Sequence, residues 1–497
     1  MNDVSEVVKQ AIEKGYQISP GAIKLLQSLY EKPETKNFDM NSLVNLVIEE
    51  KSKRSLHSGY EVLTIAEEDF VTAYPEFFES RTKAVDELTK DADFQIIKDP
   101  EIVETKEEIE GFLYLFKSRY EKISRIFKDR PDSTRLQKIS EIGVGKGSAK
   151  VCGLVLAKRV SKTSIELTID DSSGKLSAPV ISDESKKVLN QVGIDQCVLV
   201  NVENRKGRVV ITNVTQPDLP IRVISSSSKL AYAIFLSDLH IGSKKFLETA
   251  FDRFLNWING TEIRSEADED ILRHLEYVVI AGDIVDGVGV FPNQEFELVE
   301  TDVVKQYNMA AQKLAAIPKS IKILVVPGNH DSTRQALPQP KVPQKYAGAL
   351  YSLQNLLMLG DPCIVKLRGV RVLVYHGRSL DDVVATTPGL SYEKPSDAMK
   401  VLLKARHLAP SFGLRTPIAP ELEDRLVIED PPDVFHAGHV HTLGVDSYKG
   451  TLVINSGTWQ GQTSYQANLG IMPTPGVVPV MNLATSEILI KQFLTSS

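Results

Sequence analysis

The chain has 497 residues, a length that suggests roughly two to four domains and ample material for a core. Its 58 Lys and Arg against 65 Asp and Glu give a formal net charge of −7, so the sequence lacks the overall basic character of many nucleic-acid binders. Local positive charge or bound metal ions would still permit DNA binding.

The cysteines and the hydropathy of the chain indicate in which cellular compartment the protein works. Three widely spaced cysteines fit neither a disulfide framework nor a cysteine zinc site, and indicate buried thiols in a reducing environment. The N-terminus MNDVSEVVKQ is acidic where a signal peptide is basic, and the longest apolar run, Leu230–Leu236, is too short to span a bilayer. We therefore expect a cytoplasmic protein with no membrane partner.

Residues 1–50 carry apolar side chains at helical spacing, with helix-start signals at Ser19-Pro20 and Asp39, which predicts a small helical module. A linker is expected over residues 51–135. Within it, Thr105 and Glu108 form a capping box that predicts a helix near residues 105–129, before Pro131.

Residues 136–225 change to short β-branched runs separated by turn-forming pairs, with one helical segment at Asp183–Gln191. This outline predicts an OB-type β-barrel, with a generic barrel of another topology as the alternative. No Phe, Tyr or Trp occurs between Leu136 and Val223, so the segment lacks the aromatic faces on which bases stack. We expect the barrel to be a scaffold rather than a DNA-gripping module.

Residues 226–497 alternate apolar strands with helical segments, and each strand runs into a polar loop, which is typical of a layered α/β domain with its site at the strand ends. Five such loops carry potential metal ligands. They are SDLH at 237–240, GD at 282–283, PGNHD at 327–331, HG at 376–377 and GHVH at 438–441.

Together these loops supply carboxylate, amide and imidazole donors, the mixture that Mn, Fe, Zn, Ni and Co accept. Seven donors are too many for one tetrahedral zinc but suit two ions that share a carboxylate, an arrangement that favours phosphoryl displacement. The D-x-H and H-x-H spacings place alternate side chains on the same side of an extended segment. One such loop alone would be weak evidence, whereas five in order predict a binuclear centre.

The stretches SDLHIGS, AGDIVDG, PGNHDSTRQALPQP, YHGRS and AGHVHT match, in order and spacing, the motifs of calcineurin-like phosphoesterases. Their continuations, with YHGRSLDDVV and ARHLAPSFG, resemble the small exonuclease subunits of archaeal family D DNA polymerases from about Leu136 onward. The resemblance implies an α/β metallophosphoesterase, a layered β-sandwich flanked by helices, preceded by an OB-type barrel and a small N-terminal helical module.

The resemblance also implies residue roles. A first metal would be held by Asp238, His240 and His441, a second by Asn329, His376 and His439, and both by a bridging Asp283. His330 would be the general acid, oriented by Asp331. Manganese is the expected ion, with Fe, Zn, Ni or Co as alternatives. Arg334 and Arg378 flank these loops and are candidate phosphate contacts, with ordinary ion pairs as the alternative.

The implied function is a 3′→5′ exonuclease that proofreads DNA 3′ ends as the small subunit of a heterodimer with a large catalytic polymerase subunit, associated with the nucleoid through replication. Three alternatives remain. A double-strand-break repair nuclease would not need the barrel, a phosphoprotein phosphatase lacks the RQALPQP extension, and a purely structural polymerase subunit would not need the full ligand set.

Overall fold

The structure is a computed structural model that describes residues 16–18, 63–65, 93–100, 108–130, 136–142, 147–161, 164–263, 265–468 and 470–494. The chain divides into two compact units, Met1–Leu88 and Thr89–Ser497. In the first unit β1 (Tyr16–Ile18) pairs in parallel with β2 (Leu63–Ile65). The helices predicted for residues 1–50 lie outside the described residues.

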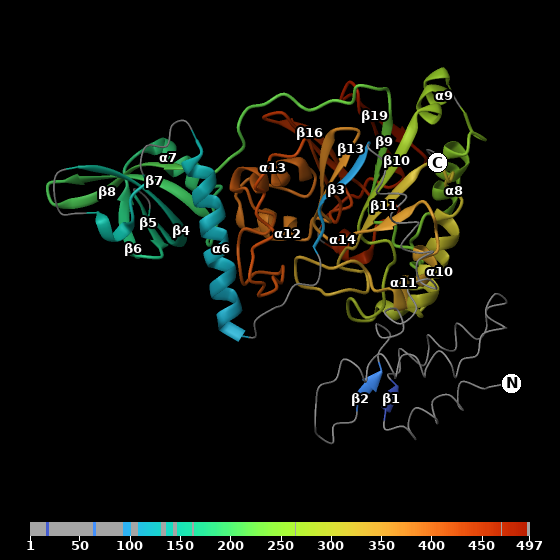
Figure 1. Cartoon of the computed structure of the whole chain (residues 1–497), viewed down its shortest axis with the longest axis horizontal. Helices are drawn as coiled ribbons and strands as arrows, with labels where there is room; N and C mark the ends of the chain where they lie inside the picture. The colour runs from blue at the N-terminus through green and yellow to red at the C-terminus, as the bar shows by residue number, and fades with distance from the viewer. Residues whose placement is uncertain are drawn as a thin grey trace. The chain divides into compact units, whose positions relative to one another are not determined.

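Two six-stranded sheets form the centre of the second unit (Figure 1). The first has the order β12 (Leu356–Met358), β11 (Lys322–Val326), β10 (Leu275–Ala281), β9 (Tyr232–Leu236), β18 (Val477–Asn482), β19 (Ile488–Gln492). The second has the order β16 (Leu443–Tyr448), β17 (Thr451–Ser456), β15 (Val434–Ala437), β14 (Val370–Val374), β13 (Cys363–Leu367), β3 (Phe94–Lys98). Strands β9 to β12 are parallel, as are β14 and β15.

The two sheets face each other across a core of β-branched and aromatic side chains drawn from both, including Phe235, Tyr277 and Val372. The first sheet is covered outside by α8 (Glu248–Ile258), α9 (Glu266–Arg273), α10 (Val303–Leu314) and α11 (Gln344–Tyr351). The second is covered by α12 (Leu380–Thr386) and α13 (Pro395–Ala405) (Figure 1). Because both faces of each sheet are buried, the central strands read as continuous apolar runs. We call this layered domain the sandwich.

Strand β3 belongs to the sandwich although it comes from the segment that the sequence analysis assigned to a linker. It pairs antiparallel with β13, and Phe94 is fully buried between the sheets. The Arg368 guanidinium secures the start of the strand, because it donates to Asp93 at 2.7 Å and to Glu276 at 2.5 Å. The strand has only five residues, FQIIK, so periodicity alone could not separate it from a loop.

A closed five-stranded barrel lies in the chain between β3 and β9 of the sandwich. Its strands have the order β4 (Ser148–Val160), β5 (Ile165–Asp171), β6 (Gly174–Val180), β8 (Arg208–Thr215), β7 (Cys197–Arg205). Helix α7 (Asp183–Leu189) connects β6 to β7 and begins where Ser182 accepts a hydrogen bond from the Ser185 amide. The barrel that the sequence predicted is therefore present, and its OB-type classification stays a prediction.

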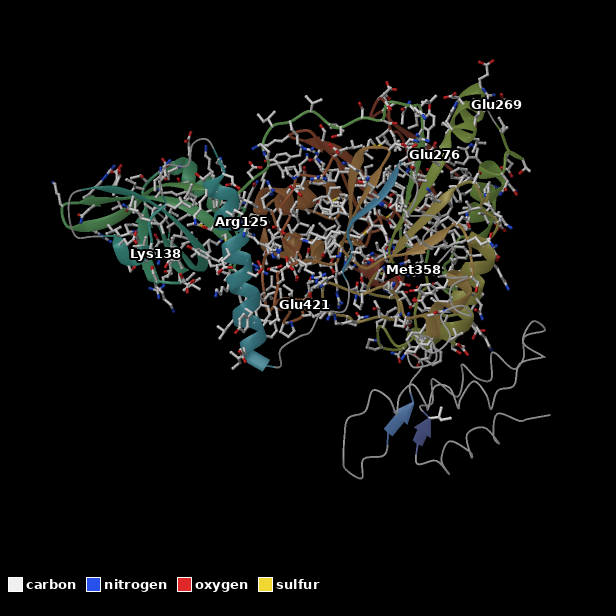
Figure 2. All side chains as sticks on the ribbon, viewed as in Figure 1. Arg125, Lys138, Glu269, Glu276, Met358 and Glu421 are labelled. Carbon is white, nitrogen blue, oxygen red and sulfur yellow. The ribbon has the colours of Figure 1, made fainter. Side chains whose placement is uncertain are left out.

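Helix α6 (Glu108–Lys128) joins the barrel to the sandwich. Ile123 and Phe127 pack with the barrel residues Cys152 and Cys197, while Leu115 belongs to the apolar layer around α13. Arg125 of α6 and Lys138 at the entrance to the barrel line one groove (Figure 2). All three cysteines are free and buried, as the sequence predicted.

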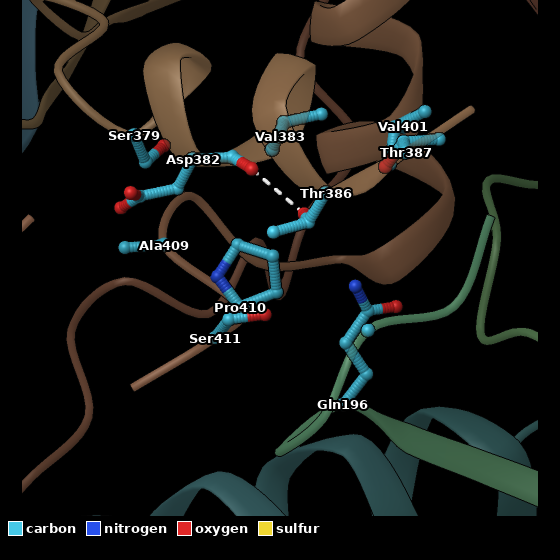
Figure 3. Close-up of a pocket in the computed structure, with 11 residues that line it drawn as sticks. Gln196, Ser379, Asp382, Val383, Thr386, Thr387, Val401, Ala409, Pro410 and Ser411 are labelled. Atoms are coloured by element: carbon cyan, nitrogen blue, oxygen red, sulfur yellow. Dashed lines mark hydrogen bonds between the residues drawn. The ribbon is translucent and has the colours of Figure 1, made fainter. Parts of the chain in front are cut away.

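The barrel also touches the sandwich directly. The Ser411 hydroxyl donates to the Ile194 carbonyl at 3.2 Å, and the Phe412 amide donates to Asp195 at 3.0 Å. Figure 3 shows this junction, where Gln196 of the barrel shares a small cavity with Pro410. None of the helices in the described part of the chain combines the length and apolar character needed to cross a membrane.

Candidate metal centre

The site lies where strands of both sheets end. Asp238 and His240 follow β9, Asp283 follows β10, and Asn329 follows β11 in the first sheet. His376 follows β14, and His439 and His441 follow β15 in the second sheet. All seven ligands predicted from the sequence thus leave parallel strands at their carboxyl ends, where side chains of neighbouring strands converge.

Among the residues that the structure describes, three groups of ligand atoms are close enough to hold a cation. They are Asp238–His240–His441, His240–Asp283–His330 and Asp283–His376–His439, and the ligand atoms within each group lie within 4.8 Å of one another. Asn329 belongs with the third group, because its Oδ1 lies 3.0 Å from Nε2 of His376. Asp283 occurs in the second and third groups and shares the second with His240, a member of the first group. Asp283 is thus the carboxylate that lies between the first and third groups, the position expected of a bridging ligand.

The distances link the groups into one cluster. Nε2 of His441 lies 3.3 Å from Oδ1 of Asp238 and 3.0 Å from Nε2 of His240. Oδ2 of Asp283 lies 3.3 Å from Nε2 of His376 and 3.7 Å from Nε2 of His240. Carboxylate, amide and imidazole donors that face one another at these distances fit divalent transition metals.

Unusual backbone geometry marks the same positions. Five of the seven, Asp238, His240, Asp283, His439 and His441, have φ between 51° and 71°, in the left-handed region that non-glycine residues rarely adopt. Such conformations persist only where the surroundings enforce them, and they concentrate at functional sites.

The glycines next to the ligands are required by close approach. A Cβ on Gly328 would lie 2.2 Å from Oδ1 of Asp283, and one on Gly438 would lie 2.4 Å from Oδ2 of Asp238. The space that a side chain would fill is thus occupied by the ligands themselves.

Three side chains and one backbone carbonyl orient the histidines, and none of these groups was predicted from the sequence. Nδ1 of His240 lies 2.9 Å from Asp286, Nδ1 of His376 lies 2.8 Å from the Ala281 carbonyl, Nε2 of His439 lies 3.1 Å from Asp381, and Nδ1 of His441 lies 2.7 Å from the Gln466 amide. At His240, His376 and His439 the partner is an oxygen acceptor, which fixes the ring and leaves its other nitrogen for a metal. At His441 the partner is the amide nitrogen of Gln466, a donor, so Nδ1 accepts. Asp286 stands in AGDIVDG and Asp381 in RSLDD, but no spacing rule predicts which histidine each one serves.

The charges in the cluster favour a cation. Burial opposes ionisation of Asp238, but His441 and His240 outweigh it and hold the pKa of Asp238 below its ordinary value. Burial is likewise outweighed at Asp283, where His376 and His330 keep the pKa low. Burial lowers and Asp283 raises the pKa of His376, with a net increase to about 10. The carboxylates thus stay ionised in a buried site, and the positive charge that they require comes from protonated histidines or from a bound cation.

His330 lies beside the cluster. The resemblance implied that Asp331 orients His330, and that expectation is wrong. Nδ1 of His330 lies 2.7 Å from the carbonyl oxygen of Asp286, an acceptor, so Nδ1 must donate. Asp331 instead accepts from the Tyr307 hydroxyl at 2.9 Å and the Gly328 amide at 2.9 Å. It is fully buried and braces the loop, so the orienting role belongs to Asp286.

The two arginines differ. Arg334 forms the ion pair that was the alternative interpretation, with Nη2 2.5 Å from Oε1 of the buried Glu421, and it is not among the described residues that line the site cavity. Arg378 donates to the carbonyl and side-chain oxygens of Gln335 at 2.8 and 3.0 Å. Asp283 and Asp381 are close enough to raise its pKa, although burial dominates and lowers it. Arg378 is likewise not among the described residues that line the cavity, and only its electrostatic proximity to Asp283 and Asp381 keeps it a candidate phosphate contact. Arg334 is held by its ion pair with Glu421.

The cluster opens into a cavity of about 540 Å³. The sandwich therefore carries one cluster of carboxylate, amide and imidazole donors at the ends of its strands. Comparisons with known proteins show which family the chain belongs to. Residues 233–442 match the family model that describes the B-subunits of DNA polymerases alpha and epsilon.

The DNA polymerase II small subunit of Archaeoglobus fulgidus is 42% identical over 75% of this chain and 75% of its own length. That of Methanothermobacter thermautotrophicus is 41% identical over 80% of this chain and 83% of its own length. The chain belongs to the family of archaeal DNA polymerase II small subunits. A solved structure of a novel archaeal phosphodiesterase is 14% identical, with a TM-score of 0.25, over 52% of this chain and 98% of its own.

Proposed function

We propose that this chain is a metal-dependent 3′→5′ DNA exonuclease that acts as a proofreading small subunit, paired with a large catalytic polymerase subunit. The observation that supports the proposed nuclease activity is the complete set of donors. Seven side chains come together from the ends of five strands. A purely structural subunit would have no need of this set or of the strained backbone that presents it. Family membership supports the polymerase context.

Two divalent ions, manganese being our first candidate, would polarise the phosphate oxygens and activate water for in-line attack. Asp238, His240 and His441 would hold one ion, and Asn329, His376 and His439 the other, with Asp283 between them. His330 donates from Nδ1 to the Asp286 carbonyl, so Nε2 carries a proton only when the ring is an imidazolium, a form that burial disfavours by lowering the pKa of His330. In that protonated form Nε2 would be the nitrogen that can give a proton to the cavity. As the bond from phosphorus to the 3′ oxygen breaks, that proton would pass to the departing oxygen.

The test uses the full chain with Mn²⁺ and a 5′-labelled single-stranded oligonucleotide. We expect a ladder of products that shorten one nucleotide at a time from the 3′ end. Asp283→Asn should abolish the ladder, and His330→Ala should reduce it by roughly 10²–10⁴-fold, the usual contribution of general acid–base catalysis.

Two other substrates test the alternative functions: a phosphopeptide, and an internally labelled duplex with blocked 3′ ends. Dephosphorylation of the peptide without DNA cleavage would indicate a phosphatase, and cleavage from blocked ends would indicate a repair-type nuclease. Retention of the ladder in Asp283→Asn would refute the assigned centre.

A further inference from the structure

The cavity over the metal cluster has an apolar side as well as a polar one. Val290, Phe291 and Pro292 come from the loop after β10, and Ile471 from the segment after α14 (Ser464–Asn468). Phe291 is 38% exposed, which is high for a large aromatic side chain in a cavity wall. Hydrolysis of a phosphodiester needs none of these side chains, so the apolar side requires its own explanation.

The loop that presents Phe291 is fastened to the catalytic side. Gln294 is fully buried, and its amide nitrogen donates to the Asp286 carbonyl at 2.8 Å while its oxygen accepts from the Val290 amide at 2.9 Å. Asp286 is also the residue that orients His240 and His330. The Phe291 ring lies 6.5 Å from the His330 ring, centroid to centroid. Phe291 thus has a fixed position relative to the reacting groups.

A second aromatic residue, Tyr392, lines the cavity beside the other metal group. Its hydroxyl hydrogen-bonds Asp381, the carboxylate that orients His439 at 3.1 Å. The cavity therefore has the donor cluster in the middle and an aromatic side chain on each side of it. Phe291 lies on the loop that is hydrogen-bonded to Asp286, and Tyr392 is hydrogen-bonded to Asp381.

We infer that Phe291 is the platform on which the base of the 3′-terminal nucleotide stacks, so that the cavity accepts an unpaired nucleotide. This inference deepens the proposed exonuclease function and rests on it. Base–aromatic stacking tolerates any base, because every base has a π-face, as a proofreading site requires. A paired terminal base must leave its partner before it can reach a ring inside a cavity, which favours frayed or mismatched ends.

The absence of aromatic side chains from residues 136–223 supports this placement. The barrel has no aromatic ring on which a base could stack, whereas Phe291 of the sandwich lies beside the reacting groups. The neighbouring Phe296, in η3 (Gln294–Glu297), is 72% exposed and is not among the described residues that line the cavity. It provides a matched control, since it is the same residue type on the same loop.

The experiment compares two single-stranded oligonucleotides, one with a normal 3′-terminal nucleotide and one ending in an abasic tetrahydrofuran residue. The full chain is measured for KM and kcat with Mn²⁺, and for Kd by fluorescence anisotropy. The wild type should prefer the normal end. In Phe291→Ala we expect KM for the normal end to rise roughly 5- to 100-fold, the loss of one stack, and the preference to vanish. Phe291→Trp should restore it, and Phe296→Ala should behave as wild type.

Two outcomes would overturn the inference. If Phe291→Ala keeps the preference for the normal end, the base does not stack there. If kcat falls equally for both ends with KM unchanged, Phe291 only supports His330. A wild type that binds but cleaves neither oligonucleotide would refute the proposed function, and the anisotropy comparison would still decide whether Phe291 recognises the terminal base.

Discussion

Helix α6 is held to the rest of the second unit by a buried ion pair, and replacing Arg119 with Met should be among the most destabilising single changes outside the metal centre. Arg119 is 1% exposed and Asp424 is 0% exposed, and Nε of Arg119 lies 2.8 Å from Oδ2 of Asp424. Nη1 also donates to the carbonyls of Pro410 at 2.8 Å and Asp195 at 3.3 Å. One guanidinium therefore links α6, the barrel and the sandwich.

Methionine keeps most of the side-chain volume but leaves a buried carboxylate and two carbonyls without this donor. Removing one partner of a buried pair costs about 3–5 kcal/mol, because the remaining charge stays desolvated. The hydrogen bond from His407 to Asp424 at 2.9 Å compensates only part of this loss. We expect the free energy of unfolding to fall by about 3–5 kcal/mol.

The control is Lys117→Met on the same helix, where the side chain is 68% exposed and pairs with Glu121 at 4.0 Å. This exposed pair should contribute less than about 1 kcal/mol. Guanidinium chloride unfolding is followed by circular dichroism and by the fluorescence of Trp257 and Trp459, which report on the sandwich core. Equal midpoints for Arg119→Met and Lys117→Met would refute the reasoning.

Three further predictions concern the metal centre, pH and the barrel. Asp283→Asn should remove both ions and Asp238→Asn mainly one, as measured by metal content per chain, and two ions retained in Asp283→Asn would contradict the bridging role. His407 accepts a backbone N–H at Nδ1 and donates from Nε2, and burial with Arg119 nearby lowers its pKa. As pH falls through about 6.5, His407 takes up a proton in the unfolded chain but not in the folded chain, whose His407 pKa is lower. The free energy of unfolding should therefore fall as pH falls. His407→Gln should reduce the dependence of that free energy on pH in unfolding titrations from pH 7 to 5. Replacing the exposed barrel cation Arg159 with Ala should change the Kd of the full chain for single-stranded DNA by less than about twofold at physiological salt, whereas a tenfold loss would make the barrel part of the DNA path.

The sequence alone determined the donor set and its place in the fold. Each of the five ligand loops follows its own apolar strand, so local patterns were enough to predict that Asp238, Asp283 and His441 meet. The central strands are buried on both faces, and such runs are the clearest strand signal a sequence offers. The spacing of the loops predicted a binuclear centre but not its substrate. The resemblance to the polymerase small subunits then implied DNA 3′ ends as the substrate.

The tertiary structure decided which partner each polar group takes. Arg334 pairs with Glu421, 87 positions away, and His330 is oriented by the Asp286 carbonyl, 44 positions away, rather than by the adjacent Asp331. Strand β3 joins β13 across more than 250 residues of chain. Hydrogen bonds and ion pairs depend on atoms within a few ångströms, and chain distance says little about which atoms arrive there. Local periodicity therefore predicts that a strand or ligand exists, while its partners follow only from the folded packing.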